Sequence, residues 1–136
     1  AVRLAAANAA KNAVAGRIGF YVGNWVAPLG RTPAFDIIAA NPPYVASGDI
    51  AQLAPEISRY EPRQALDGDE SGLREIAALI ADAADYLVAG GLLMLEIGFD
   101  QKPAIQEMAR QNPAYDAIEF IKDYSGHNRV AVLKKH

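Results

Sequence analysis

Cysteine is absent from this sequence of 136 residues, which excludes disulfide bonds and thiolate metal ligands and is compatible with a reducing compartment. Histidine occurs only as His127 and His136, and no other ligand type clusters beside them, so we expect no metal site. No apolar run approaches the roughly 18 unbroken residues of a membrane span, and no signal-peptide pattern is visible. These absences predict a cytoplasmic protein with no membrane partner.

A basic excess is also lacking. The 13 lysines and arginines are outnumbered by 16 aspartates and glutamates, which gives a net charge of -3 at pH 7. A surface that coats nucleic acid usually carries excess positive charge, and we therefore expect no nucleic-acid partner. With 51% hydrophobic and 21% charged residues, the chain can nevertheless bury a core of ordinary size. The length suits one domain over residues 1–136 and is too short for two of typical size.

The first 40 residues predict one helix and two strands. Residues 1–12 are rich in alanine, a strong helix former, and carry no capping signal of their own. Residues 17–24, RIGFYVGN, are typical of a short strand. Residues 34–40, AFDIIAA, are almost wholly apolar, which is typical of a parallel strand buried on both faces.

The remainder of the chain predicts an α/β order. Residues 45–70 are punctuated by proline, glycine and acidic residues, and we interpret them as one long connection, a kind of segment that is more often functional than idle. Helical periodicity runs from Leu73 to Val88, with Ser71 as a candidate N-cap and Gly90–Gly91 as its end. A strand, a helix and a strand hairpin follow, at residues 92–98, 102–112, 117–123 and 129–135. This order predicts a sheet with helices on its faces and ligands at the carboxyl ends of its strands.

The most informative stretch is AANPPYVAS, residues 39–47, at the carboxyl end of the second predicted strand. Pro42 and Pro43 have no N–H, so the backbone here offers only carbonyl acceptors. Asn41 precedes a proline, which favours extended geometry and fixes the direction of its side chain. The Asn41 amide oxygen and the Pro42 carbonyl can each accept one hydrogen of a planar –NH2 group, and Tyr44 offers a flat face for stacking. This corner predicts a site for an amide or exocyclic amine, whereas Asn-Pro alone would indicate only a turn.

The segment DIIAANPPYV resembles motif IV of amino-methyltransferases, which use S-adenosylmethionine to methylate amide or exocyclic amine nitrogens. Adenine DNA methyltransferases, RNA guanine methyltransferases and protein-glutamine methyltransferases share that motif. The segments YEPRQALDGDESGL, GGLLMLEIGFDQ and IKDYSGHNRVAVLKK extend the resemblance to the HemK/PrmC family over essentially the whole chain. The resemblance implies S-adenosylmethionine as cofactor, S-adenosylhomocysteine as product, and peptide-chain release factors as partners, methylated at the glutamine of their Gly-Gly-Gln loop.

The resemblance also assigns roles on the substrate side. It implies that Asn41, Pro42, Pro43 and Tyr44 bind the substrate glutamine, and that Asn41, Pro42 and Tyr44 carry the catalysis. Two acceptors that draw on the amide hydrogens would localise the nitrogen lone pair and stabilise the charge that develops there. Alignment of nitrogen, methyl group and sulfur would supply the rest, without a metal or a covalent intermediate.

On the cofactor side, the resemblance implies that Asn41 lies beside the methyl group. Trp25 matches a family position that lines the adenosine pocket, although a lone tryptophan near a strand end is also typical of a core. Asn24 stands where the family usually has an acidic residue, which implies a weaker contact with adenine.

A proton acceptor is not identified by the sequence. Glu96, Glu61 and Asp36 are candidates, but single carboxylates near strand ends are more often solvated or satisfied locally. The acidic segment DGDE, residues 67–70, is better explained as a lead-in to the following helix. We interpret KDYSGHNR, residues 122–129, as a turn whose charged residues set the hairpin.

The family comparison implies an incomplete fold of the class I methyltransferase (Rossmann-like) type, with strand order 3-2-1-4-5-7-6 and an antiparallel C-terminal hairpin. We expect residues 1–136 to form the C-terminal portion of the catalytic domain, lacking the first two strands, the glycine-rich cofactor loop and the N-terminal helical domain. The strands at 17–24 and 34–40 would then be strands 3 and 4, each with an open edge. Unseen preceding residues, another chain or re-pairing of strand 3 would fill the gap. We expect these residues alone to bind the cofactor weakly and to lack activity.

Two other functions remain open at this point. The same corner would serve a nucleic-acid amino-methyltransferase acting on adenine N6 or guanine N2, although the acidic charge and the EPRQAL segment count against it. A non-catalytic module that associates with itself or a partner through its open sheet edges is the alternative from a different class.

Overall fold

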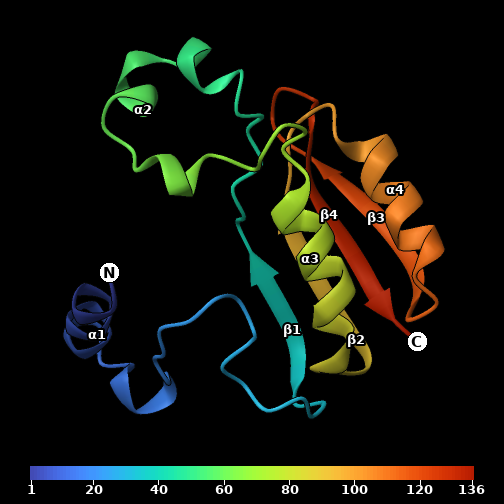
Figure 1. The fold of residues 1–136 in the computed structure, drawn as a ribbon. Coiled ribbons are helices and arrows are strands. Elements are labelled where there is room, and N and C mark those ends of the chain that lie inside the picture. Colours follow the sequence, from blue (N-terminus) through green and yellow to red (C-terminus); the bar gives the residue numbers. More distant parts are fainter. The chain divides into compact units, whose positions relative to one another are not determined.

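The computed structural model describes residues 1–136 and divides them into two compact units, Ala1–Gly30 and Arg31–His136 (Figure 1). The first unit contains helix α1, Val2–Lys11, followed by a 3-10 turn at Ala15–Arg17. The alanine-rich start of the sequence predicted this helix, and the prediction is confirmed. All other elements belong to the second unit.

The strand predicted at residues 17–24 is wrong, because residues 18–22 have no regular secondary structure. Ile18 does have an extended backbone, with φ -125° and ψ 125°. A strand, however, needs a neighbour to pair with its N–H and C=O groups, and the sheet contains only later segments of the chain. The suggestion that this segment re-pairs within the sheet is therefore wrong as well.

The second unit is built on a sheet of four strands in the order β1-β2-β4-β3. Strand β1 runs parallel to β2, whereas β2 and β4, and β4 and β3, are antiparallel. This order agrees with the order 4-5-7-6 expected for the last four strands, and the terminal hairpin is confirmed. The strands comprise Phe35–Ala40 (β1), Leu87–Glu96 (β2), Tyr115–Lys122 (β3) and Asn128–Lys135 (β4).

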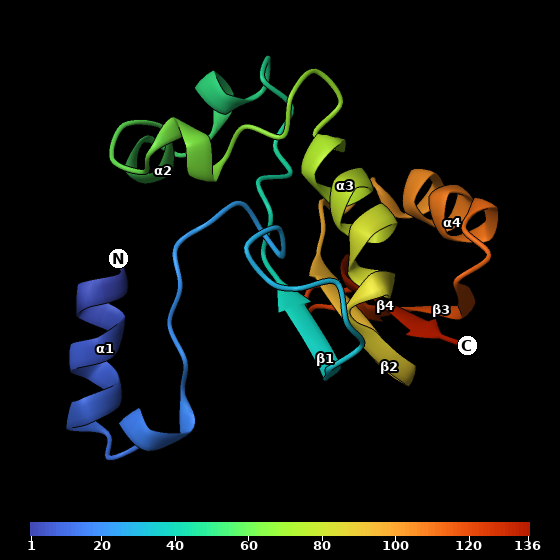
Figure 2. The same cartoon turned by 60° about the horizontal axis from the view of Figure 1, so that its bottom comes forward.

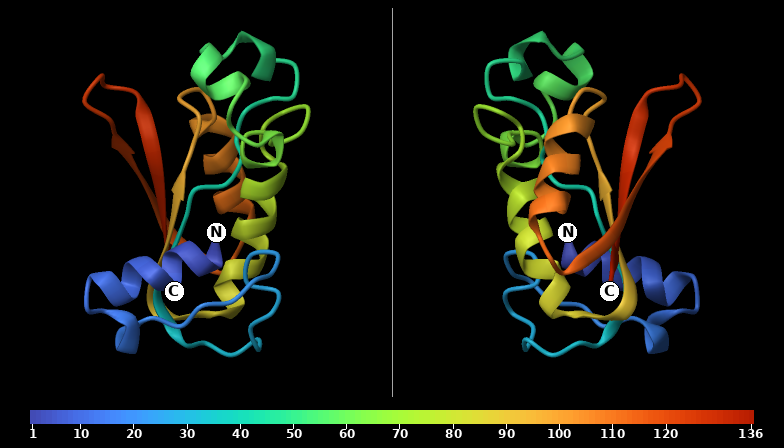
Figure 3. Two further views of the ribbon diagram at one scale, coloured as in Figure 1. Left: turned by 90° about the vertical axis from the view of Figure 1, so that its left-hand side faces the viewer. Right: turned by 90° about the vertical axis from the view of Figure 1, so that its right-hand side faces the viewer.

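Helices α3, Arg74–Asp82, and α4, Lys102–Gln111, lie side by side on one face of this sheet (Figures 2 and 3). The α4 prediction, with Pro103 in the first turn, is confirmed. The core lies between the helices and the sheet, where side chains of α3, β2 and β4 are fully buried. No helix is long and apolar enough to cross a membrane.

Strand β1 is not buried on both faces, contrary to the prediction from its apolar sequence. Ile37 remains 56% exposed and Phe35 38% exposed. The reason is that β1 pairs only with β2, so its other edge is open as expected, and α3 and α4 cover only one face. An apolar run thus indicates that a strand is suited to burial, but not how much of its surface the rest of this chain covers.

For the helix that was predicted to follow Ser71, the predicted C-terminal end at Gly90–Gly91 is also wrong. Helix α3 begins after Leu73 without a side-chain capping bond, and it ends at Asp82 in a 3-10 turn, Ala83–Asp85. Leu87 and Val88 already belong to β2, because Leu87 pairs with Phe35 of β1. Gly91 lies at an irregularity of that pairing, where an added Cβ would lie 3.2 Å from the carbonyl oxygen of Asp36. The two glycines therefore serve the strand pairing rather than the helix end.

The long connection after β1 contains only short helical turns. These are the 3-10 turns Ile50–Gln52 and Arg63–Ala65 and the four-residue helix α2, Pro55–Ser58. The segment stands beyond the carboxyl end of β1, as the green ribbon of Figure 1 shows. It returns to the sheet at the start of α3, so both of its ends lie close to the end of β1.

Candidate functional site

The corner predicted from the sequence begins one residue after β1 ends. Strand β1 stops at Ala40, which pairs with Leu95, and the two prolines that follow have no N–H with which to continue the ladder. The Pro42 side chain is fully buried, whereas Asn41 is exposed. The corner is therefore anchored through a proline ring and presents the amide of Asn41 at the surface.

The acceptors of this corner are not used by the protein itself. No hydrogen bond from the chain reaches the side-chain oxygen of Asn41 or the carbonyl oxygen of Pro42. Both groups are stronger acceptors for an external donor than groups that are already paired. Both acceptors are therefore available to an external donor, and binding of an –NH2 group at this corner stays a prediction.

A cavity of about 510 Å³ opens beside the corner. Asn41, Pro42 and Tyr44 form one wall, and the connection after β1 contributes the apolar side chains of Leu53 and Ile57. A mostly apolar hollow with a few unpaired polar groups is the usual form of a ligand site. Residues far apart in the sequence meet here, since the loop between β2 and α4 supplies Gly98 to Gln101.

A second hollow, of about 370 Å³, is also lined by Asn41. Its lining includes Ala39, Ala40, Met94 and Glu96. The two alanines have small side chains, which leaves space next to the strand ends. Asn41 lines both hollows, so one amide side chain borders two candidate binding spaces.

Tyr44 is held by a carboxylate from the neighbouring strand. Its hydroxyl donates to Glu96 Oε1 at 2.9 Å, and Glu96 is the last residue of β2. Burial raises the pKa of the Tyr44 hydroxyl, the hydrogen bond to Glu96 raises it further, and the nearby guanidinium of Arg129 opposes the shift. Tyr44 is thus a neutral donor with a fixed ring, and Glu96 is engaged as an acceptor.

Arg129 connects the corner to the terminal hairpin. It donates to Asp123 Oδ2 at 3.2 Å and to the carbonyl of Ile97 at 3.2 Å, and it lines the larger cavity. Asp123 also accepts from the backbone N–H groups of Ser125 and His127. The His127 amide is the main cause that lowers the pKa of Asp123, and Arg129 adds to it. The prediction that charged residues set this turn is confirmed.

Gln101 is the one buried polar residue of the core, at 8% exposure. Its Nε2 donates to the carbonyls of Tyr44 and Gly72, each at 3.0 Å, and its Oε1 accepts from the N–H of Gly98 at 2.9 Å. Both hydrogens and the oxygen of the side chain are therefore used, and three loops meet on it.

Two glycines allow the returning chain to lie against the backbone of the corner. A Cβ at Gly72, where φ is +70°, would overlap the carbonyl oxygen of Tyr44. A Cβ at Gly68 would lie 2.7 Å from the carbonyl oxygen of Pro43. Contacts this close between backbones require glycine. Residues 68–72 are therefore part of the corner rather than only a lead-in to α3.

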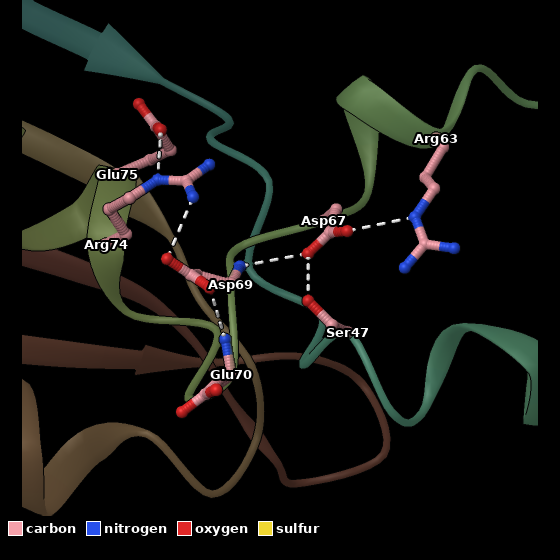
Figure 4. A network of polar contacts seen from close by, with 7 residues as sticks. All are labelled: Ser47, Arg63, Asp67, Asp69, Glu70, Arg74 and Glu75. Atoms are coloured by element: carbon pink, nitrogen blue, oxygen red, sulfur yellow. Dashed lines mark hydrogen bonds and ion pairs between the residues drawn. The ribbon is translucent and has the colours of Figure 1, made fainter.

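Figure 4 shows the polar network that fastens this return. Asp67 accepts from the Ser47 hydroxyl, from Arg63 Nε at 3.0 Å and from the N–H of Asp69 at 3.0 Å. The Ser47 hydrogen bond is the largest cause that lowers the pKa of Asp67, followed by Arg63. The backbone supports the same contact, since Val45 and Asp67 form a parallel bridge. The network comprises Ser47, Arg63, Asp67, Asp69, Glu70, Arg74 and Glu75.

The structure separates the three candidate proton acceptors. Glu96 lies at the corner, but it accepts from Tyr44. Asp36 lies near the opposite end of β1, and Glu61 is exposed and does not line the cavity. Of the three, only Glu96 is close enough to influence the corner.

Three other residues considered in the sequence analysis are Asn24, Trp25 and His127. Asn24 is exposed and Trp25, whose carbonyl accepts from the Tyr21 hydroxyl at 3.0 Å, is half-buried; both belong to the first unit. Their role in cofactor binding stays a prediction. His127 makes an edge contact with Phe99, with ring centroids 5.8 Å apart, and the structure contains no group of three or more candidate metal ligands.

Sequence reasoning missed Gln101, Gly68 and Gly72 as parts of the site. A glutamine at the start of a helix and glycines in an acidic loop have no distinctive local pattern. Their partners are carbonyls of Pro43 and Tyr44, and only the fold brings these groups together.

No model of a known protein family matches the sequence. The chain is 42% identical over 135 residues to a release factor glutamine methyltransferase of Thermodesulfovibrio yellowstonii, covering 99% of this chain and 47% of that protein. It is 37% identical over 132 residues to one of Gloeobacter violaceus, covering 97% of this chain and 46% of that protein. A bifunctional methyltransferase of Rickettsia felis is 35% identical over 133 residues, covering 98% of this chain and 25% of that protein.

These matches extend over nearly all of the 136 residues, including the corner and the segments around it. The chain spans about half the length of the release factor glutamine methyltransferases that it matches, at 46% and 47% of the two proteins. By sequence, the chain is similar over nearly its whole length to release factor glutamine methyltransferases and corresponds to somewhat less than half of their length.

Proposed function

We propose that these residues form the substrate-binding part of a protein-(glutamine-N5) methyltransferase. The enzyme would transfer a methyl group from S-adenosylmethionine to the side-chain amide of the glutamine in the Gly-Gly-Gln loop of peptide-chain release factors. The names of the relatives support this substrate class, and the unpaired acceptors of the corner support an amide as the acceptor group. The proposed fold is of the class I methyltransferase (Rossmann-like) type, in a cytoplasmic enzyme.

The corner would act by orienting the amide. The Asn41 oxygen and the Pro42 carbonyl would each accept one amide hydrogen, which would increase electron density at the nitrogen and stabilise the positive charge that develops there during transfer. Tyr44 would stack on the amide plane, with its ring held by the hydroxyl bond to Glu96. Removal of one such electrostatic contact costs about 100- to 1,000-fold in kcat in other enzymes.

The second hollow that Asn41 lines fits a small, reactive group at the strand ends. Its alanine lining leaves space, and Asn41 and Glu96 supply polar atoms beside it. S-adenosylmethionine supplies an electrophilic methyl group when bound. We propose that Asn41, which borders both hollows, holds the amide of the larger cavity with its nitrogen facing that methyl group, while Asn24 and Trp25 contribute to the adenosine site. We expect the 136-residue chain alone to bind the cofactor weakly, which calorimetry would test.

The observation that carries the proposal is the pair of unpaired acceptors at Asn41 and Pro42, at the mouth of the cavity. The test is transfer of labelled methyl by a full-length enzyme that carries these residues. Release factor should be labelled, and a release factor with Gln→Ala in the Gly-Gly-Gln loop should not. Asn41→Ala should lower kcat about 100-fold or more, whereas Asn8→Ala, on exposed helix α1, should leave it unchanged. Label in adenine-containing DNA or in RNA instead of protein would refute the proposal.

A further inference from the structure

Both side-chain polar atoms of Gln101 are already engaged within the protein. Its two hydrogens are donated to the carbonyls of Tyr44 and Gly72, and its oxygen accepts from Gly98. It nevertheless lines the larger cavity and is only 8% exposed. A buried amide with every group satisfied fixes the groups it contacts, because each alternative position would leave a buried polar group unpaired.

What Gln101 fixes is the far end of the corner. The hydrogen bond from Gln101 fixes the orientation of the Tyr44 carbonyl. The next residue, Val45, then forms the bridge with Asp67. The prolines already restrict φ at positions 42 and 43. With the carbonyl of residue 44 also fixed, little torsional freedom remains between the end of β1 and the bridge.

The same hydrogen bond selects which carbonyls stay available. The Tyr44 carbonyl is occupied by Gln101, and the Pro43 carbonyl faces the backbone at Gly68. The Pro42 carbonyl has no donor in the chain. A rotation of the 44–45 peptide would expose a competing acceptor beside the correct one, and the incoming –NH2 group could then bind in two orientations.

We propose that Gln101 is a positioning residue of the methyl-transfer reaction, which acts through the Tyr44 carbonyl to hold the Asn41–Tyr44 corner in its productive orientation. The inference rests on the function proposed above. Gln101 makes no contact with the substrate amide in this account, because its donors are already used. Its effect therefore falls on the orientation of the amide in the transition state rather than on binding of the cofactor.

The test uses two substitutions in a full-length enzyme that carries these residues. Gln101→Met keeps the unbranched shape and removes all hydrogen bonds, while Gln101→Glu keeps the shape and removes the two donors. Gln106→Met is the matched control, since Gln106 lies on α4, the helix that Gln101 immediately precedes, and is exposed. Each variant is assayed for methyl transfer to release factor, with kcat and the KM for S-adenosylmethionine measured separately, and the folded fraction is determined by circular dichroism.

We expect both Gln101 variants to lower kcat by about 10- to 100-fold per folded molecule, with the KM for S-adenosylmethionine within about twofold of the parent. A purely structural role would reduce the folded fraction and leave kcat per folded molecule unchanged, and that result in either variant would overturn the inference. Should Gln101→Met fail to fold, Gln101→Glu decides the question. If the parent enzyme itself does not methylate the glutamine, the proposed function fails; if it does and the variants match it, only the role of Gln101 fails.

Discussion

Substitution of Gly72 by alanine tests whether the returning chain presses directly on the corner. Gly72 has φ +70°, where a residue with a Cβ costs about 1–2 kcal/mol relative to glycine. The new Cβ would in addition overlap the carbonyl oxygen of Tyr44 and lie 2.8 Å from Gln101 Nε2. The overlapped atom belongs to the backbone, so relief requires movement of the corner itself, at a cost of about 1–3 kcal/mol. The total is about 2–5 kcal/mol.

Gly126 provides the matched control, because its φ is +86° and an added Cβ would meet nothing within 4 Å. Gly126→Ala should lose only the backbone contribution of about 1–2 kcal/mol. The change in unfolded-state entropy is shared by both variants and cancels in the difference. The difference between Gly72→Ala and Gly126→Ala therefore isolates the contact with Tyr44.

The assay is equilibrium unfolding in urea, followed by far-ultraviolet circular dichroism. We expect Gly72→Ala to lower the free energy of unfolding by at least about 1 kcal/mol more than Gly126→Ala does. Equal losses would refute the reasoning, because they would show that the corner accommodates a Cβ at this position without strain.

Three further outcomes are expected. Tyr44→Phe removes the hydrogen bond from the hydroxyl to Glu96 at 2.9 Å and should lower the free energy of unfolding by about 1 kcal/mol. A decrease in kcat per folded molecule would show that this hydrogen bond also orients the ring. Burial raises the pKa of Tyr115 to about 12 from 10.0, so below pH 10 this group adds no pH dependence. Between about pH 10 and 12 the Tyr115 hydroxyl loses its proton first in the unfolded chain, so the free energy of unfolding should fall by up to about 2.7 kcal/mol. This loss should be absent in Tyr115→Phe when urea midpoints are compared across the same pH range. Ile37→Lys places a charge on the open β1 edge, where Ile37 is 56% exposed, and should reduce any concentration-dependent association seen by light scattering; association that is equal in parent and variant would argue against this edge as the contact.

The sequence predicted most elements of the second unit because their signals are local. The Asn112-Pro113 end of α4, the short turn of the hairpin and the apolar β1 all depend on neighbouring residues. The errors concern pairing. The strand expected at residues 17–24 has suitable residues but no neighbour in the sheet, and Leu87 joined β2 because β1 offers it a partner. Strand propensity describes what a segment can do, whereas a partner decides whether it does so.

The site divides in the same way. The sequence singled out Asn41, Pro42 and Tyr44 as candidates, because the absence of N–H groups at two prolines is a property of the sequence itself. The three residues line one cavity, and their role in binding stays a prediction. That Tyr44 donates to Glu96 could not be identified in advance, because the two residues meet only through the parallel pairing of β1 with β2. Glu96 was a candidate proton acceptor from its place at a strand end. Because Glu96 accepts the hydrogen bond from the Tyr44 hydroxyl, its observed role is to hold the Tyr44 ring.

In the proposed reaction, the sequence and the fold would together let a corner of several carbonyls recognise one –NH2 group. The prolines remove donors, but they leave a run of acceptors without a preference among them. The fold then occupies or covers the later ones, since Gln101 takes the Tyr44 carbonyl and the Gly68 backbone faces that of Pro43. The Pro42 carbonyl and the Asn41 amide remain, side by side at the cavity. Under the proposed function, selectivity for an amide hydrogen pair would depend on carbonyls that the substrate does not touch, and we expect it to be lost by changes at Gln101 or Gly72 that leave the Asn-Pro-Pro-Tyr sequence intact.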